Sequence, residues 1–338
     1  MAMTIYDISK KAGVSIATVS RVLNGSENVR PSTRKKVMDV IDNYDYTPNA
    51  FARGMGLHSL KTIGILCADS SDLFLAKAVY FLEQELQANG YESLLCCTGY
   101  NPDIKKNYLN LILSKKVDSI ILVGSHFIGF NEDENQYIKD VSTQVPIMLL
   151  NASFDHPNVY STLCDDYGTM FEAATEMIQS GITDILYLYD SKSYSGLKKL
   201  HGFCDAMKEY NIPGFEKLIH FYDGNIEHLN EVADFVARIA TKGTSFHGIM
   251  TSDDSLAIGS IKYAQKKGIR IPEELSVMGY NNSMLTNCCT PELTSVDNRL
   301  ETQTHQLVQT LLGVLAGEEM PKKSIFSGKI IKRGTTLF

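Results

Sequence analysis

Beyond residue 60, short apolar stretches typical of buried strands alternate with longer amphipathic stretches typical of helices. This alternation runs through two series, and each series predicts a parallel, doubly wound sheet covered by helices. The chain is therefore expected to form an α/β core of two similar lobes, with a ligand site beyond the carboxyl ends of the strands, between the lobes. The expected strands are 62–68, 91–98, 117–124, 145–150, 182–189, 217–222, 247–251 and 275–280, and the expected helices are 73–89, 103–116, 167–180, 196–210, 230–242 and 255–267.

The first sixty residues have a different pattern, that of a small all-α domain. Thr4 and Asp7 have the spacing of a capping box, which predicts a first helix that stops at Gly13. Ser15 is placed to cap a second helix over 16–23, which should end at the Asn-Gly pair that follows. Two short helices joined by a Gly-Val-Ser turn form the helix-turn-helix pattern.

A third helix is expected to start at Pro31 and to end before Pro48. Its apolar residues recur at helical spacing, which predicts one buried face. This face is expected to consist of Val37, Val40, Ile41 and Tyr44. Three helices of this size can bury a common core that includes Ala12, Val19, Val22, Val37 and Ile41.

Charge is distributed unevenly along the chain. The net charge is −7, which by itself argues against a nucleic-acid partner. Residues 1–60 nevertheless hold eight Lys and Arg against five Asp and Glu, a balance of +3, whereas the rest of the chain holds 24 against 34, a balance of −10. A basic end on an acidic body predicts that DNA contact is confined to the first sixty residues.

Several classes of protein are disfavoured by the sequence. No stretch has the roughly 18 uncharged apolar residues of a membrane span, and the first residues do not have the pattern of a secretion signal. The seven cysteines lack CxxC spacing and the histidines lack metal-site spacing, so we expect a cytoplasmic protein without metal or cofactor. The absence of GxGxxG after a strand, of a P-loop and of GxSxG argues against an enzyme.

The run Thr4-Ile-Tyr-Asp-Ile-Ser-Lys-Lys-Ala-Gly-Val-Ser-Ile-Ala-Thr-Val-Ser-Arg-Val-Leu-Asn-Gly25 resembles the headpiece of the LacI/GalR family of transcriptional regulators, and its Ile-Ala-Thr-Val-Ser-Arg part is nearest to the catabolite-control type. Segments 28–34, 46–50, 268–282 and 291–296 resemble the same family, whose core is similar to periplasmic sugar-binding proteins. The resemblance implies a DNA-binding headpiece over 1–47, a hinge helix or linker over 48–60 and an effector-binding and dimerisation core over 61–338, with an N-lobe of about 61–160 plus 291–322 and a C-lobe of about 161–290 plus 323–338.

The resemblance also implies that the second helix enters the major groove of DNA. Ile16 and Ala17 would stand at base-reading positions, and Arg21 would pair with guanine, with a phosphate contact as its alternative role. Met55 would take the place of the leucine that the family inserts into the minor groove, although its segment could also be a plain linker. The expected DNA contacts are Thr4, Ser15, Ile16, Ala17, Thr18, Ser20, Arg21, Asn24, Asn28, Arg30, Asn49, Ala50, Arg53 and Met55.

By the same resemblance, the effector site lies at the strand ends of both lobes. The family's Thr-Asn-Asp stands here as Ser-Asp-Asp at 252–254, and its Gly-Phe/Tyr-Asp as Gly-Tyr-Asn at 279–281, so amide and carboxylate have traded places. Ser193 and Lys199 stand where the family has arginines. The expected effector contacts are Asp69, Asp72, Phe74, Ser125, His126, Asn151, Ser193, Lys199, Asp253 and Asn281.

The exchange suggests the chemistry of the ligand. We expect a neutral or cationic polyhydroxyl compound, held by Asp253 and Asn281 and stacked on Phe74. Local turn chemistry is the alternative role of each of these residues, and Asp254 is expected to be a helix N-cap rather than a ligand contact.

These features predict a sequence-specific DNA-binding regulator that acts as a repressor. It would bind a pseudo-palindromic operator as a homodimer, and a sugar or related metabolite in the cleft would control it. The alternatives are the same DNA-binding role with a core that answers a phosphoprotein, and a cytosolic solute-binding protein. The sequence leaves open whether the effector releases or tightens the DNA complex.

Overall fold

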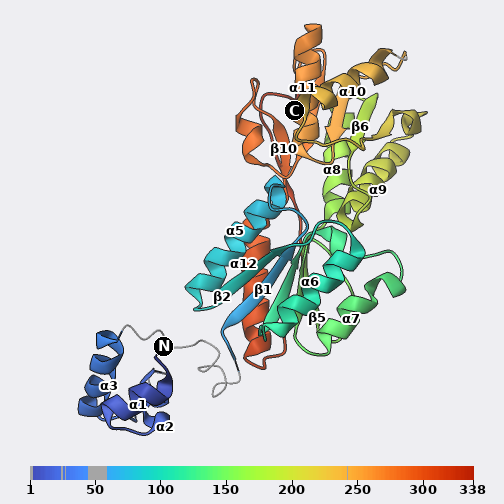
Figure 1. The fold of residues 1–338 in the computed structure, drawn as a ribbon. Coiled ribbons are helices and arrows are strands. Elements are labelled where there is room, and N and C mark those ends of the chain that lie inside the picture. The colour runs from blue at the N-terminus through green and yellow to red at the C-terminus, as the bar shows by residue number, and fades with distance from the viewer. Residues whose placement is uncertain (1–2, 24–25, 27, 45–58, 242) are drawn as a thin grey trace.

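The structure is a computed structural model that describes residues 3–23, 26, 28–44, 59–241 and 243–338. It consists of a small unit of three helices followed by a core of two α/β lobes (Figure 1). In the described part of the chain, no helix is long and apolar enough to cross a membrane.

The N-terminal unit contains α1 (Ile5–Ala12), α2 (Ile16–Leu23) and α3 (Pro31–Asn43). Thr4 caps α1 through the expected capping box with Asp7, and Gly13 ends it at a φ of 67°, which glycine adopts without strain. Ser15 Oγ accepts a hydrogen bond of 3.2 Å from the amide of Thr18 at the start of α2. The three predicted helices and the predicted roles of Thr4, Gly13, Ser15 and Pro31 at their ends are confirmed, whereas the Asn-Gly pair predicted to end the second helix lies outside the described residues.

The core of this unit is formed by aliphatic side chains from all three helices. Tyr44 is not part of it: this residue lies just beyond α3, is 52% exposed and accepts a 3.0 Å hydrogen bond from Lys11 Nζ. The expectation that Tyr44 continues the buried face is wrong, because the helix ends one residue earlier and the phenol ring turns toward the ammonium group. The buried residues are Ile8, Val19, Val22, Val29, Val37 and Ile41.

The N-lobe is built on a six-stranded parallel sheet in the order β11-β5-β4-β3-β1-β2. Two buried clusters lie on its two faces, one with α5 (Leu73–Ala88) and α12 (Leu300–Leu315), the other with α6 (Pro102–Ser114) and α7 (Gln136–Ser142). The strands are β1 (Thr62–Cys67), β2 (Glu92–Cys97), β3 (Ser119–Val123), β4 (Ile147–Leu150), β5 (Val159–Cys164) and β11 (Lys323–Phe326).

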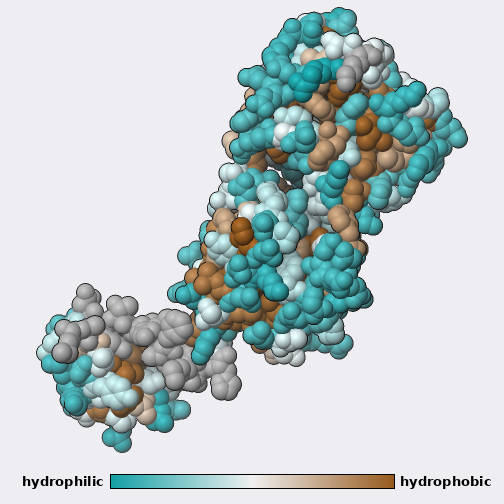
Figure 2. Space-filling view, turned by 45° about the vertical axis from the view of Figure 1, so that its right-hand side comes forward, coloured by the Kyte–Doolittle hydropathy of each residue, from teal (hydrophilic) through white to brown (hydrophobic). Residues whose placement is uncertain are grey.

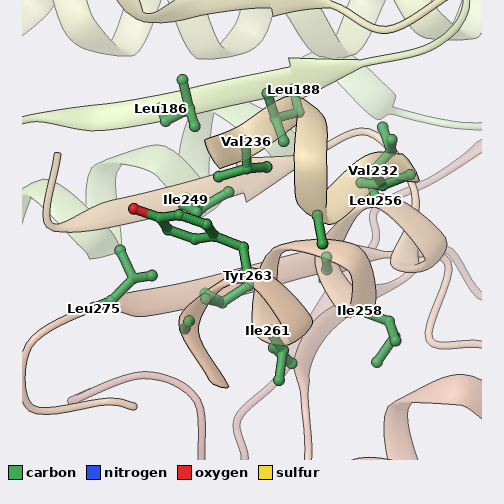
Figure 3. Close-up of a cluster of buried hydrophobic side chains, with 14 of the residues drawn as sticks. Leu186, Leu188, Val232, Val236, Ile249, Leu256, Ile258, Ile261, Tyr263 and Leu275 are labelled. Carbon is green, nitrogen blue, oxygen red and sulfur yellow. The ribbon is translucent and has the colours of Figure 1, made fainter. Parts of the chain in front are cut away.

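The C-lobe repeats this plan with the order β12-β10-β9-β8-β6-β7, in which only β12 runs antiparallel to its neighbour. One face is covered by α8 (Asp166–Gln179) and α9 (Tyr194–Glu209), the other by α10 (Leu229–Thr241) and α11 (Asp254–Lys267), whose cluster with the sheet is drawn in Figure 3. The strands are β6 (Ile185–Tyr189), β7 (Ile219–Phe221), β8 (Gly248–Thr251), β9 (Ser276–Tyr280), β10 (Thr294–Asp297) and β12 (Lys329–Ile331).

Each strand and helix predicted from the two series is present within a few residues. The prediction did not include α7, β5, β10, α12, β11 and β12. Four of these elements have only three to six residues. The helix α12 is long, and the spacing of Leu307, Val308 and Leu311 on its buried side is a helix signal that the prediction missed.

The chain passes between the lobes in segments 164–166, 297–300 and 326–329. The first crossing lies close to its predicted place near 160, but the other two come later than the predicted 290 and 323. The reason is strand pairing: β10 extends the C-lobe sheet beside β9, and β11 extends the N-lobe sheet beside β5. Residues 291–297 therefore belong to the C-lobe and residues 323–326 to the N-lobe.

Two helical glycines allow a matched test of this packing. A Cβ atom on Gly202 would lie 2.3 Å from the carbonyl oxygen of Tyr167, because α9 packs closely against α8. The three atoms nearest to a Cβ atom on Gly313 instead all belong to the flexible side chain of Met320. We expect Gly202→Ala to lower the free energy of unfolding of the core by about 1–3 kcal/mol and Gly313→Ala to change it by less than about 1 kcal/mol, because alanine is the better helix former. Urea denaturation of both variants measures the difference, and equal losses would contradict the backbone clash.

Candidate functional site

The helix α2 has one face in the core and one face in solvent. Val19 and Val22 are buried, whereas Ile16 is 39% exposed and Ala17 and Arg21 are also exposed. Positions 17 and 21 share one side of the helix because they are one turn apart, and position 16, the first residue of α2, borders that side. The three side chains predicted to read bases therefore lie together on the outer face of α2.

The hydroxyl groups around this face lie at the helix starts, at Thr4, Ser15 and Thr18, and within α2, at Ser20. Ser15 Oγ is 2.9 Å from Thr18 Oγ1 at the start of α2, and Ser20 is half-buried. The Thr4 hydroxyl donates to Asp7 at 2.6 Å, and this bond holds the pKa of the Asp7 carboxyl below its usual value. Thr4 is thus already engaged as a helix cap.

Two further predicted contacts lie at the start of α3. Arg30 is exposed at the N-cap position of α3, and Asn28 is exposed in the preceding turn. The remaining predicted contacts, Asn24, Asn49, Ala50, Arg53 and Met55, lie outside the described residues.

The strand ends of the two lobes enclose a cavity of about 620 Å³ and an adjoining cavity of about 100 Å³ that shares part of its lining. The cavities lie where the two lobes meet, at the waist of the core in Figure 2. All ten predicted effector residues line one or both of them. The larger cavity contains Asp69, Asp72, His126 and Asp253, and the smaller adds Phe74, Ser125, Asn151, Ser193, Lys199 and Asn281.

Asp253 lies at the centre of the C-lobe side. One carboxylate oxygen caps α11 by accepting from the Ser255 amide at 2.7 Å, and the other accepts from Asn281 Nδ2 at 2.9 Å. The predicted pair is therefore joined directly. Burial, reinforced by the charges of Asp190 and Asp254, raises the pKa of Asp253 to about 7.

Asp254 has a different role from the one expected. Its carboxylate accepts 2.6 Å hydrogen bonds from the Ser283 amide and the Ser295 hydroxyl, so it ties two neighbouring segments to the start of α11. Burial raises its pKa to about 6. The expectation that Asp254 is the N-cap is wrong, because Asp253 occupies that position.

The N-lobe contributes two more carboxylates. Asp72 caps α5 by accepting from the Leu75 amide at 2.8 Å, and its pKa is raised mainly by burial and further by the charge of Asp190. Asp69 accepts from the amide and hydroxyl of Ser71, and these bonds lower its pKa. Across the cavity, Asp190 follows β6 and accepts from the Ser252 hydroxyl at 2.8 Å.

The lysines near the cleft are already engaged. Lys199 is buried, donates to the Ser252 carbonyl at 3.0 Å and stands 3.9 Å above the ring centre of Tyr280. Lys105 donates to the His126 carbonyl at 2.6 Å. Burial and the charge of Lys105 lower the pKa of His126, so the imidazole is neutral at pH 7. Lys199 thus lines the smaller cavity, but its ammonium group is bound to the Ser252 carbonyl and the Tyr280 ring.

The aromatic side chain in the larger cavity is Tyr100, not Phe74. The Tyr100 ring is 52% exposed and meets His126 edge-on at a centroid distance of 4.8 Å. Tyr100 and Asp190 follow strands that the sequence predicts, so the strand-end rule would have found them. The loop residues Asn225, Ile226 and Glu227 also line the cavity, and no sequence signal points to them.

A helix-turn-helix unit joined to a two-lobed α/β core with a cleft defines the class of ligand-responsive transcription regulators. Residues 4–49 match the model of bacterial regulatory proteins of the lacI family, and residues 174–336 match a periplasmic binding protein-like domain. An HTH-type transcriptional regulator of Lachnoclostridium phytofermentans is 49% identical over 99% of this chain and 100% of its own. Catabolite control protein A of Priestia megaterium is 33% identical over 88% of this chain and 87% of its own.

A solved structure of the lac repressor dimer bound to operator has the same fold, with a TM-score of 0.88, 20% identity and full coverage of both chains. The chain belongs to the lacI family of bacterial regulatory proteins and is a DNA-binding transcriptional regulator. The predicted family is confirmed, and the relatives are regulators rather than enzymes or solute-binding proteins.

The raised pKa of Asp253 predicts a dependence of stability on pH. The pKa of the Asp253 carboxyl is 3.8 in the unfolded chain and about 7 in the folded chain, so the folded chain binds this proton more tightly. As the pH rises through this range, ionisation of Asp253 therefore lowers the stability of the fold. Asn at this position can still cap α11. Asn would lose the hydrogen bond from Asn281 Nδ2, because two amide donors would then face each other, and this loss does not depend on pH. We therefore expect the melting temperature of ligand-free Asp253→Asn, relative to that of the natural protein, to be a few degrees higher at pH 8 than near pH 4, a difference of about 2 kcal/mol.

Thermal denaturation at several pH values measures this difference. Asp155→Asn, at an exposed loop position, is the matched control and should melt with the natural protein throughout. An advantage of Asp253→Asn that did not depend on pH would contradict the assignment.

Proposed function

We propose that the chain is a cytoplasmic repressor that binds a pseudo-palindromic DNA operator as a homodimer and is controlled by a small polyhydroxyl effector in the cleft between its lobes. The observation that carries the proposal is the outer face of α2, where Ile16, Ala17 and Arg21 are exposed together while Val19 and Val22 hold the helix on its core. The lac repressor, which shares the fold, is bound to its operator as a dimer.

The chemistry of this face suits the major groove. Arg21 can donate two parallel hydrogen bonds to guanine, whereas Ile16 and Ala17 fit against thymine methyl groups. Ser15 and Thr18 at the start of the helix have hydroxyls of the kind that bind phosphate. Arg21 would therefore determine which base sequence is bound, and the hydroxyls and Arg30 would fix the orientation of the three-helix unit on the DNA.

The dimer is proposed to form along α5 and β2. β2 is an edge strand of the N-lobe sheet, and its Leu94 and Leu95 are 38% and 42% exposed. Tyr80 on α5 is also exposed, and hydrophobic surface is visible on the N-lobe in Figure 2. An uncovered edge strand with apolar side chains favours pairing with a second chain, and a twofold dimer would present two equal headpieces to the operator.

A chain of hydrogen bonds connects the cleft to the N-lobe. Asn281 donates to Asp253 at 2.9 Å, Asn298 donates to Asn281 at 3.0 Å, and Gln303 donates to the Asn298 carbonyl at 2.6 Å. Gln303 lies on α12, which packs against α5. An effector that engages Asp253 would therefore act on the element that borders the proposed dimer face, and so on the spacing of the headpieces.

Arg21→Ala tests the DNA-binding surface. We expect the variant to lose about 1–3 kcal/mol of discrimination at one base pair of each half-site, because the bidentate contact with guanine is lost. Arg30→Ala is the matched control and should weaken binding to all sequences alike. Selection from random oligonucleotides, followed by titration of single-base variants, measures both effects. Equal weakening on every sequence by Arg21→Ala would make Arg21 a phosphate contact.

Leu95→Asp tests the dimer face. A carboxylate in each of two facing edge strands would repel its counterpart, so we expect monomers in sedimentation equilibrium and weaker binding to a full operator. Leu111→Asp is the control, since Leu111 is similarly exposed but lies on α6, on the opposite face of the sheet. If Leu111→Asp dissociated the protein and Leu95→Asp did not, the interface would have to lie elsewhere.

A further inference from the structure

The charged side chains that line the larger cavity are acidic. Five carboxylates line the larger cavity, those of Asp69, Asp72, Asp190, Glu227 and Asp253, and among the described residues no lysine or arginine lines it. Its only histidine, His126, is neutral at pH 7 because burial and Lys105 lower its pKa. A neutral sugar requires hydrogen-bonding groups but no such excess of negative charge.

The acids of the cleft are not neutralised by the protein. Asp72, Asp190 and Asp253 accept hydrogen bonds only from amides and a hydroxyl, and none of the ion pairs in the described part of the chain includes them. The ammonium groups of Lys105 and Lys199 point at backbone carbonyls instead, and that of Lys192 lies over the Phe221 ring. Partly buried carboxylates without a counter-charge destabilise the fold, which favours a ligand that supplies the charge.

The arrangement does not suit a metal ion. Among the described residues, no group of three or more His, Cys, Asp or Glu side chains is placed to hold one. The carboxylates are instead spread around a cavity of about 620 Å³, in which Tyr100 presents an exposed ring and Ser191 and Asn225 present neutral polar groups. Such a surface suits an organic cation that also carries hydroxyl groups, because an ammonium group can lie between carboxylates and against an aromatic face.

We propose that the effector is an ammonium-bearing polyhydroxyl compound of the amino-sugar class, whose cationic group lies between Asp72, Asp190 and Asp253. This inference rests on the proposed function, because it names the ligand class of the same cleft. The hydroxyl groups of the ligand would meet the neutral polar side chains, and its ring would lie against Tyr100.

The test is calorimetric titration of the full-length dimer with three hexoses that differ in charge at one position. Glucosamine carries an ammonium group at neutral pH, N-acetylglucosamine is neutral at the same carbon, and glucose has a hydroxyl there. A galactosamine series tests the other common hydroxyl configuration. We expect at least one amine to bind 10-fold or more tightly than its N-acetyl and hydroxyl counterparts. Equal or tighter binding of the neutral sugars, or no binding of either amine, would overturn the proposal.

Asp190→Asn keeps the shape of the side chain and removes its charge. We expect it to weaken binding of the amine about 10- to 100-fold, the range for a hydrogen bond to a charged group, and to leave binding of the neutral analogue within about 2-fold. Asp155→Asn, at an exposed position that does not line the cleft, should change neither. An equal loss for amine and neutral sugar would show that Asp190 only shapes the pocket.

Operator titration with and without each sugar separates this inference from the proposed function. A neutral sugar that binds the cleft and changes operator affinity would sustain the proposed function and overturn the amine. A chain that binds no specific DNA sequence would overturn the proposed function, while the preference of the cleft for the amine could still be measured.

Discussion

The carboxyl ends of two parallel sheets face each other across three chain crossings, and the site depends on this arrangement. The crossings are held by backbone and side chains alike: the Asp165 amide donates to the Phe326 carbonyl at 2.8 Å, and Tyr280 donates to Asp166 at 2.6 Å. Since the parallel strands end at the waist, the residues that follow the central strands lie at the cleft. The polar character of the cleft therefore follows from topology, and its charge follows from which residues the sequence places at those ends.

Two groups of buried acids at the waist differ in how they are satisfied. Burial raises the pKa of Asp166, but this side chain makes short hydrogen bonds with Ser195 and Tyr280 and has the charge of Lys199 nearby, so it has a structural role at the crossing. Asp253 has no cation beside it, and its neighbours Asp190 and Asp254 raise its pKa further. A buried carboxylate whose ionisation costs stability is typical of a binding site, where a ligand can complete the interaction.

The sequence predicts this architecture well wherever a local pattern repeats, because the periods of strands and helices depend only on neighbouring residues. The prediction fails for short strands, because their pairing depends on strands that are distant in the chain. Four residues at 294–297 join the C-lobe sheet, and four at 323–326 join the N-lobe sheet, through such contacts. The same distinction between local patterns and distant contacts applies to the residues of the site. Strand ends such as Asp72 and Asp253 are predictable, whereas the 2.9 Å bond between Asp253 and Asn281 joins residues 28 positions apart.

The acidity of the core also keeps the two binding surfaces apart. Residues 1–60 have a balance of +3 and the remainder −10, so the phosphate backbone of DNA attracts the first segment and repels the second. Repulsion between the core and DNA extends over roughly one Debye length, about 10 Å at 0.1 M salt. DNA is therefore held at the headpiece and excluded from the cleft, which leaves its carboxylates free for a small cation. A single sequence can thus maintain an anion-binding surface and a cation-binding cavity, because the opposite charges lie in different parts of the chain.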